Sequence, residues 1–365
     1  MTFVPGLELS RAFFAECVAP ALGELAPSLR YAAALIGEGS EVLGYDAAVS
    51  TDHDWGPRVL LFVAPKDFRS AARAIIPGLE GRLPGAFKGW PVAFGDSDRP
   101  AGIDEQAGAA GSLTHGIELH DLTAWTRRRL GIGPEDPMPP TRWLAVPEQV
   151  LLSLTAGAVF RDDDSGVTAL RHRLAWFPTD VWLYKLGCQW VRIGEEAAFL
   201  GRCGDTGDDL GSRLVAGRLV HDAMRIGFLM TRRYAPYAKW FGRAFRDLDL
   251  ANGVAGPLAA ALAAEDWRDR ERFLNTALLR LAEQHLEMGL PGAIAPRLAP
   301  YHQRPYEVIN AGEIAEAIFR EIQDPAVQTL ARTGAADQFS DSTAVLAHPQ
   351  RARDVAFAAL GVRTP

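Results

Sequence analysis

The feature that most constrains this chain is a short apolar run with two acidic residues directly before it. The run VLLFV (59–63) is branched and apolar, and Pro65 follows it, which predicts a buried β-strand. Asp52 and Asp54 precede the run in the segment TDHDW. Side chains two residues apart on a strand share a face, so we expect the two carboxylates to point the same way. Such a pair either raises one pKa or recruits a cation.

A Gly-Ser pair, Gly39 and Ser40, lies about a dozen residues upstream of the acidic pair. Glycine lets backbone N–H groups approach a phosphate closely, and a serine hydroxyl adds a hydrogen bond. Oxygen ligands suit a hard ion such as Mg²⁺, which proteins hold with one or two carboxylates plus substrate phosphates. The alternative interpretation is an ordinary, solvated acidic turn.

The arrangement of predicted elements indicates two domains. Strands alternate with helices up to about residue 135, and the proline-rich stretch GPEDPMPPTRW that follows is the best linker in the sequence. The remainder has helical periodicity, with Asp180 as the expected N-cap of a helix that buries Trp182, Leu186 and Trp190. We therefore expect an α+β chain, with a small mixed-sheet domain over 1–135 and a larger all-helical domain over 141–365, the latter a helix bundle plus C-terminal helices.

Composition excludes several classes of protein. A net charge of −7 and an isoelectric point near 5.7 argue against a general nucleic-acid binder. The three cysteines have no CxxC spacing, so neither a zinc site nor a disulfide framework is expected. We see no secretory signal and no apolar segment of membrane-spanning length, so the expected location is the cytoplasm, without membrane partners.

The Gly-Ser and Asp-x-Asp pattern resembles the signature of the nucleotidyltransferase superfamily, whose fold is that of the polymerase-beta catalytic domain. Two longer stretches, GSEVLGYDAAVSTDHDWGPRVLLFV and LAWFPTDVWLYKLGCQW through to KWFGRAF, resemble bacterial proteins with the domain of unknown function 4037. This resemblance covers most of residues 30–330. It implies that Gly39 and Ser40 hold the triphosphate, and that Asp52 and Asp54 bind Mg²⁺.

The same resemblance implies a third carboxylate on a neighbouring strand. The best candidate is Glu118 in HGIELHDL, because Ile117 and Leu119 alternate with it and place it on a polar face. Asp96 and Asp98 in FGDSD are the alternatives.

A similarity of architecture to kanamycin-type nucleotidyltransferases implies that a lysine of the helical domain meets the nucleotide's phosphates. Lys239 and Lys185 are the two candidates, since both lie among aromatic residues on predicted helices. The alternative for each is a lysine that packs its stem over an aromatic patch. Arg58 is expected either to close the motif loop or to contact a phosphate.

The resulting hypothesis is a Mg²⁺-dependent enzyme that moves a nucleoside monophosphate from a triphosphate to an acceptor hydroxyl. The expected acceptor is a small molecule, with protein or RNA as alternatives. Asp52, Asp54 and Glu118 would be the catalytic and metal-binding residues. The competing hypothesis is a degenerate, non-catalytic protein of the same fold that binds nucleotide or a protein partner.

Overall fold

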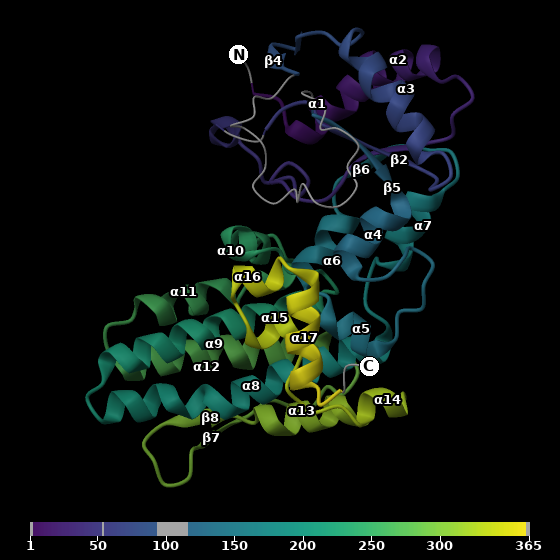
Figure 1. The fold of residues 1–365 in the computed structure, drawn as a ribbon. Helices are drawn as coiled ribbons and strands as arrows, with labels where there is room; N and C mark the ends of the chain where they lie inside the picture. Colours follow the sequence, from purple (N-terminus) through teal and green to yellow (C-terminus); the bar gives the residue numbers. More distant parts are fainter. Residues whose placement is uncertain (1–2, 53–54, 93–115, 363–365) are drawn as a thin grey trace. The chain divides into compact units, whose positions relative to one another are not determined.

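The structure is a computed structural model that describes residues 3–52, 55–92 and 116–362, apart from the side chain of Asp52. It divides into two compact units, Met1–Pro137 with Val150–Ala175, and Met138–Gln149 with Trp176–Pro365. The first unit contains a small mixed sheet and the second is mostly helical, which confirms the predicted fold class (Figure 1). None of the helices in the described ranges is long and apolar enough to cross a membrane.

The first unit consists of short elements. In chain order they are α1 (Gly6–Phe13), the π-helical turn η1 (Phe14–Val18), α2 (Ala19–Leu25), β1 (Ala32–Leu35), the 3₁₀ turn η2 (Ala48–Asp52), β2 (Val59–Val63), α3 (Phe68–Glu80), β3 (Ala86–Phe87), β4 (Trp90–Pro91), β5 (Ile117–Asp121), α4 (Leu122–Leu130), β6 (Ala158–Asp162) and α7 (Gly166–Arg173). Helix α6 (Glu148–Thr155) begins in the second unit and ends in the first.

The sheet of the first unit has the strand order β5-β2-β1-β6. Strand β2 runs parallel to β5 and antiparallel to β1, and β1 is antiparallel to β6. All five residues of β2 are buried, as expected for an inner strand that is covered on both faces. The alternate residues Val59, Leu61 and Val63 pack into the core that α1 and α3 complete. The apolar run is thus the centre of the unit, as its composition predicts.

Two strands of this sheet differ from the expectation. The segment 158–162 lies in the part of the chain that was expected to be helical. It instead forms β6 and pairs with β1. Strand β1 is built largely from alanines, which have weak β-propensity. Both strands form because pairing and burial within the sheet override local preference, so the sequence after the linker completes the first unit.

The second unit is dominated by three long helices, α8 (Thr179–Asp205), α9 (Asp209–Met230) and α12 (Trp267–Glu287). Its other elements are α5 (Pro140–Ala145), α10 (Ala238–Arg246), the 3₁₀ turn η4 (Asp249–Ala251), α11 (Ala255–Ala263), β7 (Leu298–Pro300), β8 (Glu307–Ile309), α13 (Ala311–Arg320), α14 (Pro325–Gln328), α15 (Ala336–Phe339), α16 (Thr343–Leu346) and α17 (Pro349–Ala359). The β7–β8 hairpin is an addition to the expected helices.

Helix α8 buries the predicted face, since Trp182, Leu186 and Trp190 are all inaccessible to solvent or nearly so. The expected N-cap is wrong, because Pro178 occupies that position and Asp180 lies in the first turn. The Asp180 carboxylate instead accepts hydrogen bonds from the N–H groups of residues 323 and 324, at 3.2 and 2.6 Å. It therefore fixes the chain that leads into α14.

Lys185 lies on α8 and is completely buried. Its Nζ is 2.9 Å from Oδ1 of Asp337 and 3.0 Å from Oε1 of Glu148. Burial lowers the pKa of Lys185, but the two carboxylates outweigh this effect and raise it above its ordinary value. Both acids also accept backbone hydrogen bonds, Glu148 from Ala235 and Asp337 from Glu148 itself. This buried charge cluster therefore ties α6, α8 and α15 together.

We expect Lys185→Met to lower the free energy of unfolding by about 3–5 kcal/mol, because it leaves two buried carboxylates without their cation. Urea denaturation measures the change. Lys239→Met is the matched control, since Lys239 is exposed and its loss should cost no more than about 0.5 kcal/mol. Equal stability of the two variants would contradict a structural role for the buried cluster.

Candidate functional site

The register of three neighbouring strands relates two of the predicted site features, the Gly-Ser turn and Glu118. Ala34 of β1 pairs with Leu60 of β2, and Leu60 pairs with Glu118 of β5. Adjacent strands lie about 4.8 Å apart, so the backbones of Ala34 and Glu118 are separated by about 10 Å. Strand β1 ends one residue after Ala34, and the Gly-Ser turn follows directly. The turn and Glu118 therefore lie near each other.

The turn has a backbone shape that requires glycine. Gly37 and Gly39 have φ angles of +102° and +133°, which side chains of L-residues rarely allow. The N–H of Gly37 donates to the carbonyl of Ser153 at 2.8 Å, so the turn is anchored on α6. A Cβ atom at Gly39 would lie 2.5 Å from Oε1 of the buried Glu41. The turn is thus held in one conformation by its neighbours.

Arg58 precedes β2 and closes this turn from the other side. Its N–H donates to Oγ of Ser10 at 3.1 Å, and its Nη2 donates to the carbonyl of Glu38 at 3.3 Å. Its Nη1 is 3.3 Å from Oε1 of Glu41, and only 16% of the Arg58 side chain is exposed. The expected role in closing the motif loop is therefore met, while a phosphate contact of Arg58 stays a prediction.

Glu118 occupies the polar face of β5 that the alternation predicts, with Ile117 and Leu119 buried in the core on the other face. Its side chain is 39% exposed and Oε2 lies 2.9 Å from Nε2 of His120. His120 in turn packs against the ring of Trp125. Glu118 is thus oriented by a neighbour on its own strand and is still open to solvent.

The electrostatic surroundings favour an ionised Glu118. Burial acts to raise the pKa of Glu118, but the hydrogen bond to His120 and the charges of Arg58 and Arg129 outweigh it and lower the pKa below its ordinary value. At neutral pH the group is therefore a carboxylate. An ionised, partly exposed carboxylate beside a glycine-rich turn is a suitable ligand for a hard cation.

Four predicted acids fall where the structure gives no side chain to describe. Asp52 is the last residue of η2, but its side chain is outside the described residues, as is all of Asp54. The alternatives for the third acid, Asp96 and Asp98, are also outside them. Within the described ranges, no group of three or more His, Cys, Asp or Glu residues could hold a metal. The metal site built from Asp52, Asp54 and Glu118 therefore stays a prediction.

The two candidate lysines have different environments. Lys185 is enclosed in the charge cluster with Glu148 and Asp337 and has no exposed surface. A lysine that is saturated by two buried carboxylates is not available to a phosphate, so its expected role as a nucleotide ligand is wrong in this structure. Lys239 on α10 is exposed, and its Nζ lies 5.0 Å from the centre of the Trp240 ring. Its phosphate contact stays a prediction.

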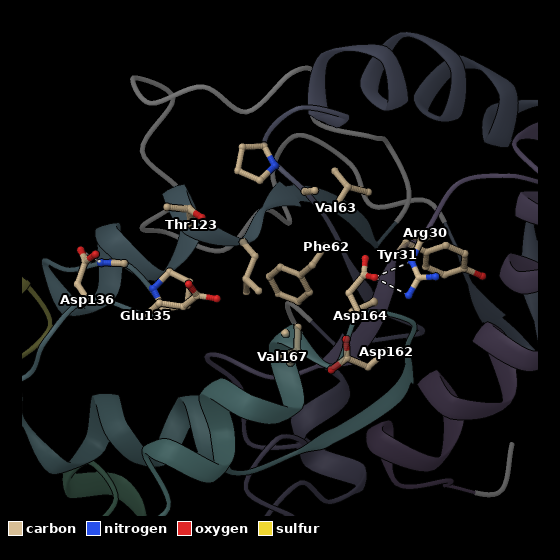
Figure 2. A pocket seen from close by; sticks show the side chains of 17 residues that line it. Arg30, Tyr31, Phe62, Val63, Thr123, Glu135, Asp136, Asp162, Asp164 and Val167 are labelled. Carbon is tan, nitrogen blue, oxygen red and sulfur yellow. Dashed lines mark hydrogen bonds and ion pairs between the residues drawn. The ribbon is translucent and has the colours of Figure 1, made fainter.

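A cavity of about 340 Å³ opens in the first unit, where β2 and β5 end and β1 begins. Val63, the last residue of β2, lies in its wall, as Figure 2 shows. Ala32, which begins β1, and Leu122, which follows β5, also line it. None of the predicted site residues whose side chains the structure describes lines it. Because Glu118 lies three residues before the end of β5, the cavity is offset along the sheet from the Glu118 region.

Acidic residues that line this cavity form ion pairs and hydrogen bonds with nearby groups. Asp164 pairs with Arg30 at 2.5 Å on an exposed surface, as Figure 2 shows. The carboxylates of Asp162 and Asp136 accept hydrogen bonds from nearby backbone N–H groups, each at 2.7 Å. Asp162 is also the last residue of β6. These acids therefore stabilise turns around the cavity.

Two neighbours of Glu118 were missed in the sequence, His120 and Arg129. The signal for His120 is present, because a residue two positions after Glu118 on a strand shares its face. Arg129 stands in the run Arg127–Arg128–Arg129 of α4 and is not distinguished there from its exposed neighbours. Only the fold shows that its guanidinium lies over the Trp125 ring, at 4.1 Å from the ring centre.

We expect Gly39→Ala to destabilise the protein by about 1–3 kcal/mol, because alanine is strained at this φ angle and its methyl group would collide with Glu41. The control is Gly23→Ala in α2, where the added methyl meets open space and should stabilise the helix by about 0.5–1 kcal/mol. Denaturation midpoints measure both changes. A neutral Gly39→Ala would show that the turn is not held in this conformation.

We expect His120→Ala to raise the pKa of Glu118, because the variant removes a hydrogen bond that opposes the effect of burial. Carboxyl-carbon NMR titration measures the pKa, and the spectrum of Glu118→Gln assigns the resonance. His172→Ala, which removes an exposed histidine of α7, should leave the titration unchanged. An unaltered Glu118 titration in His120→Ala would contradict the pairing.

The family match covers parts of both units. Residues 143–241 match the model of a family described as a domain of unknown function (DUF4037). No curated protein matches the chain. The chain is similar to a solved nucleotidyltransferase-like protein from Exiguobacterium sibiricum 255-15, with 11% identity, a TM-score of 0.33, and 83% of this chain and 97% of that chain covered. Residues 143–241 of this chain are therefore similar to the DUF4037 family, whose model matches this segment alone.

Proposed function

We propose that the protein is a Mg²⁺-dependent nucleotidyltransferase that moves a nucleoside monophosphate from a triphosphate to a hydroxyl group of a small molecule. The observation that carries the proposal is the placement of the ionised Glu118 next to the Gly37–Ser40 turn by the register of β1, β2 and β5. The Gly-Ser and Asp-x-Asp pattern implies a third acid on a neighbouring strand, and the position of Glu118 supports it as the candidate.

The donor set fits a hard divalent cation. Glu118 contributes an ionised carboxylate that is open to solvent, and Asp52 and Asp54 would contribute two more. Carboxylate oxygens are the ligands that Mg²⁺ prefers. When bound, Mg²⁺ would neutralise charge on the attacking and leaving oxygens during displacement at the α-phosphorus.

The chain's own residues bind and orient the substrate. Gly39 and Ser40 would hold the phosphates, since a backbone without a Cβ allows close approach. Arg58 holds the turn in place through the Glu38 carbonyl and Glu41. The acceptor hydroxyl gives its proton to water, its oxygen forms a bond to the α-phosphorus, the bond from that phosphorus to the bridging oxygen breaks, and pyrophosphate leaves.

The lowered pKa helps to assign the role of Glu118. A general base works best when its pKa is near the operating pH, and that of Glu118 lies below the ordinary glutamate value. Glu118 is therefore better suited to hold the cation than to take the proton of the acceptor hydroxyl.

The test is incubation of the full chain with each α-labelled nucleoside triphosphate and Mg²⁺, with and without cell extract as the source of acceptor. A labelled product that requires Mg²⁺ is the expected result. Triphosphate binding by calorimetry without any labelled product would overturn the proposal in favour of a non-catalytic nucleotide-binding protein.

Substitutions of the predicted metal ligands test whether the reaction takes place at this site. Glu118→Gln and Asp52→Asn should each lower turnover by more than about a hundredfold, the scale expected when one charge-stabilising group is removed from a reacting centre. Glu135→Gln is the control, because it removes an exposed carboxylate that lines the separate cavity. Unchanged turnover in Glu118→Gln would exclude this carboxylate from the reaction.

A further inference from the structure

Arg129 has an unusual position for a residue in a run of three arginines. Arg127 and Arg128 are exposed on α4, whereas Arg129 is half-buried, with its guanidinium 4.1 Å from the centre of the buried Trp125 ring. Burial lowers the pKa of Arg129 below its ordinary value, although the group stays charged. The protein therefore holds a partly desolvated cation on one aromatic face.

This cation has no ionic partner among the described residues. No hydrogen bond or ion pair joins its guanidinium to them, and the acids that influence it, Glu38 and Glu118, act from beyond ion-pair distance. Arg58, in the same region, is by contrast paired with Glu41. A half-buried charge without a partner loses part of its hydration, and nothing in the described protein compensates for that loss. An anionic ligand that binds at Arg129 would compensate for it.

The guanidinium also borders the glycine-rich turn. A Cβ atom at Gly37 would lie 3.7 Å from Nη2 of Arg129. The residues that follow Gly37 lead directly to Gly39 and Ser40, and the same turn is held by Arg58 through the Glu38 carbonyl. Two arginines therefore flank one turn, and the one on α4 keeps its hydrogen-bond donors available.

We propose that Arg129 binds the pyrophosphate portion of the triphosphate and holds it as the leaving group. This inference rests on the proposed function for the identity of the anion. The planar guanidinium donates two parallel hydrogen bonds to phosphate oxygens, and stacking on Trp125 fixes its plane in advance. As the bond between the α-phosphorus and the bridging oxygen breaks, the developing negative charge of pyrophosphate lies beside Arg129.

The first test measures the binding of pyrophosphate with Mg²⁺ to the full chain by calorimetry. Arg129→Gln should weaken binding by about tenfold or more, the loss expected for one charge-assisted interaction. Arg129→Lys should bind with intermediate affinity, since it keeps the charge but loses the planar fork. The matched control is Arg128→Gln, which removes the same charge from the exposed face of α4 and should change affinity by less than about twofold.

The second test uses the unaltered protein and does not depend on the folding of a variant. Phenylglyoxal modifies accessible arginines, and peptide mass spectrometry measures the extent of modification at each position. Pyrophosphate with Mg²⁺ should protect Arg129 and leave Arg128 unprotected. Equal modification of Arg129 with and without pyrophosphate, or equal affinity of Arg129→Gln and the unaltered protein, would overturn the inference.

These measurements separate the inference from the proposed function, because pyrophosphate binding requires neither an acceptor nor turnover. Protection of Arg129 without any labelled transfer product supports the anion site and overturns the proposed reaction. Labelled product with the same yield from Arg129→Gln and the unaltered protein supports the reaction and overturns the role of Arg129.

Discussion

The hydrogen bonding of β2 on both of its edges is the constraint on which the first unit depends. This inner strand joins an antiparallel neighbour, β1, to a parallel neighbour, β5. The two pairings use the same residue, Leu60, to align Ala34 with Glu118. A slip of one residue in either pairing would turn Glu118 toward the core or move the Gly-Ser turn away from it. The site geometry is therefore a property of strand register.

The parts of this arrangement that the sequence reveals are those encoded by local periodicity. The apolar run of β2 and the alternation around Glu118 each identify a strand and its faces without knowledge of any neighbour. The buried face of α8, with Trp182 and Trp190, is equally visible in a helical period. Local periodicity is sufficient to predict a helix or strand and its buried face wherever one segment contains both the apolar and the polar residues of that element.

The features that local pattern misses depend on partners far away in the chain. In the sequence, Lys185 resembles any other lysine among aromatic residues. Its interaction with Asp337, 152 residues away, is visible only in the fold. In the sequence, Arg129 is indistinguishable from its exposed neighbours, and only the fold shows that it lies beside Gly37. Strand β1 lacks the branched residues of a typical strand and forms because β2 and β6 pair with it. In each case the deciding contact is non-local, so propensity and periodicity carry no signal for it.

The position of β6 in the chain has a consequence for synthesis. The ribosome releases β1, β2 and β5 before the proline-rich segment, whereas β6 follows it. Until β6 emerges, β1 exposes a row of unpaired N–H and C=O groups along one edge, and such an edge is open to pairing with other chains. The nascent first unit can therefore complete its sheet only after translation has passed through residues 138–149, which belong to the second unit. During translation the sheet of the first unit therefore stays incomplete until β6, which follows the proline-rich segment, has been synthesised.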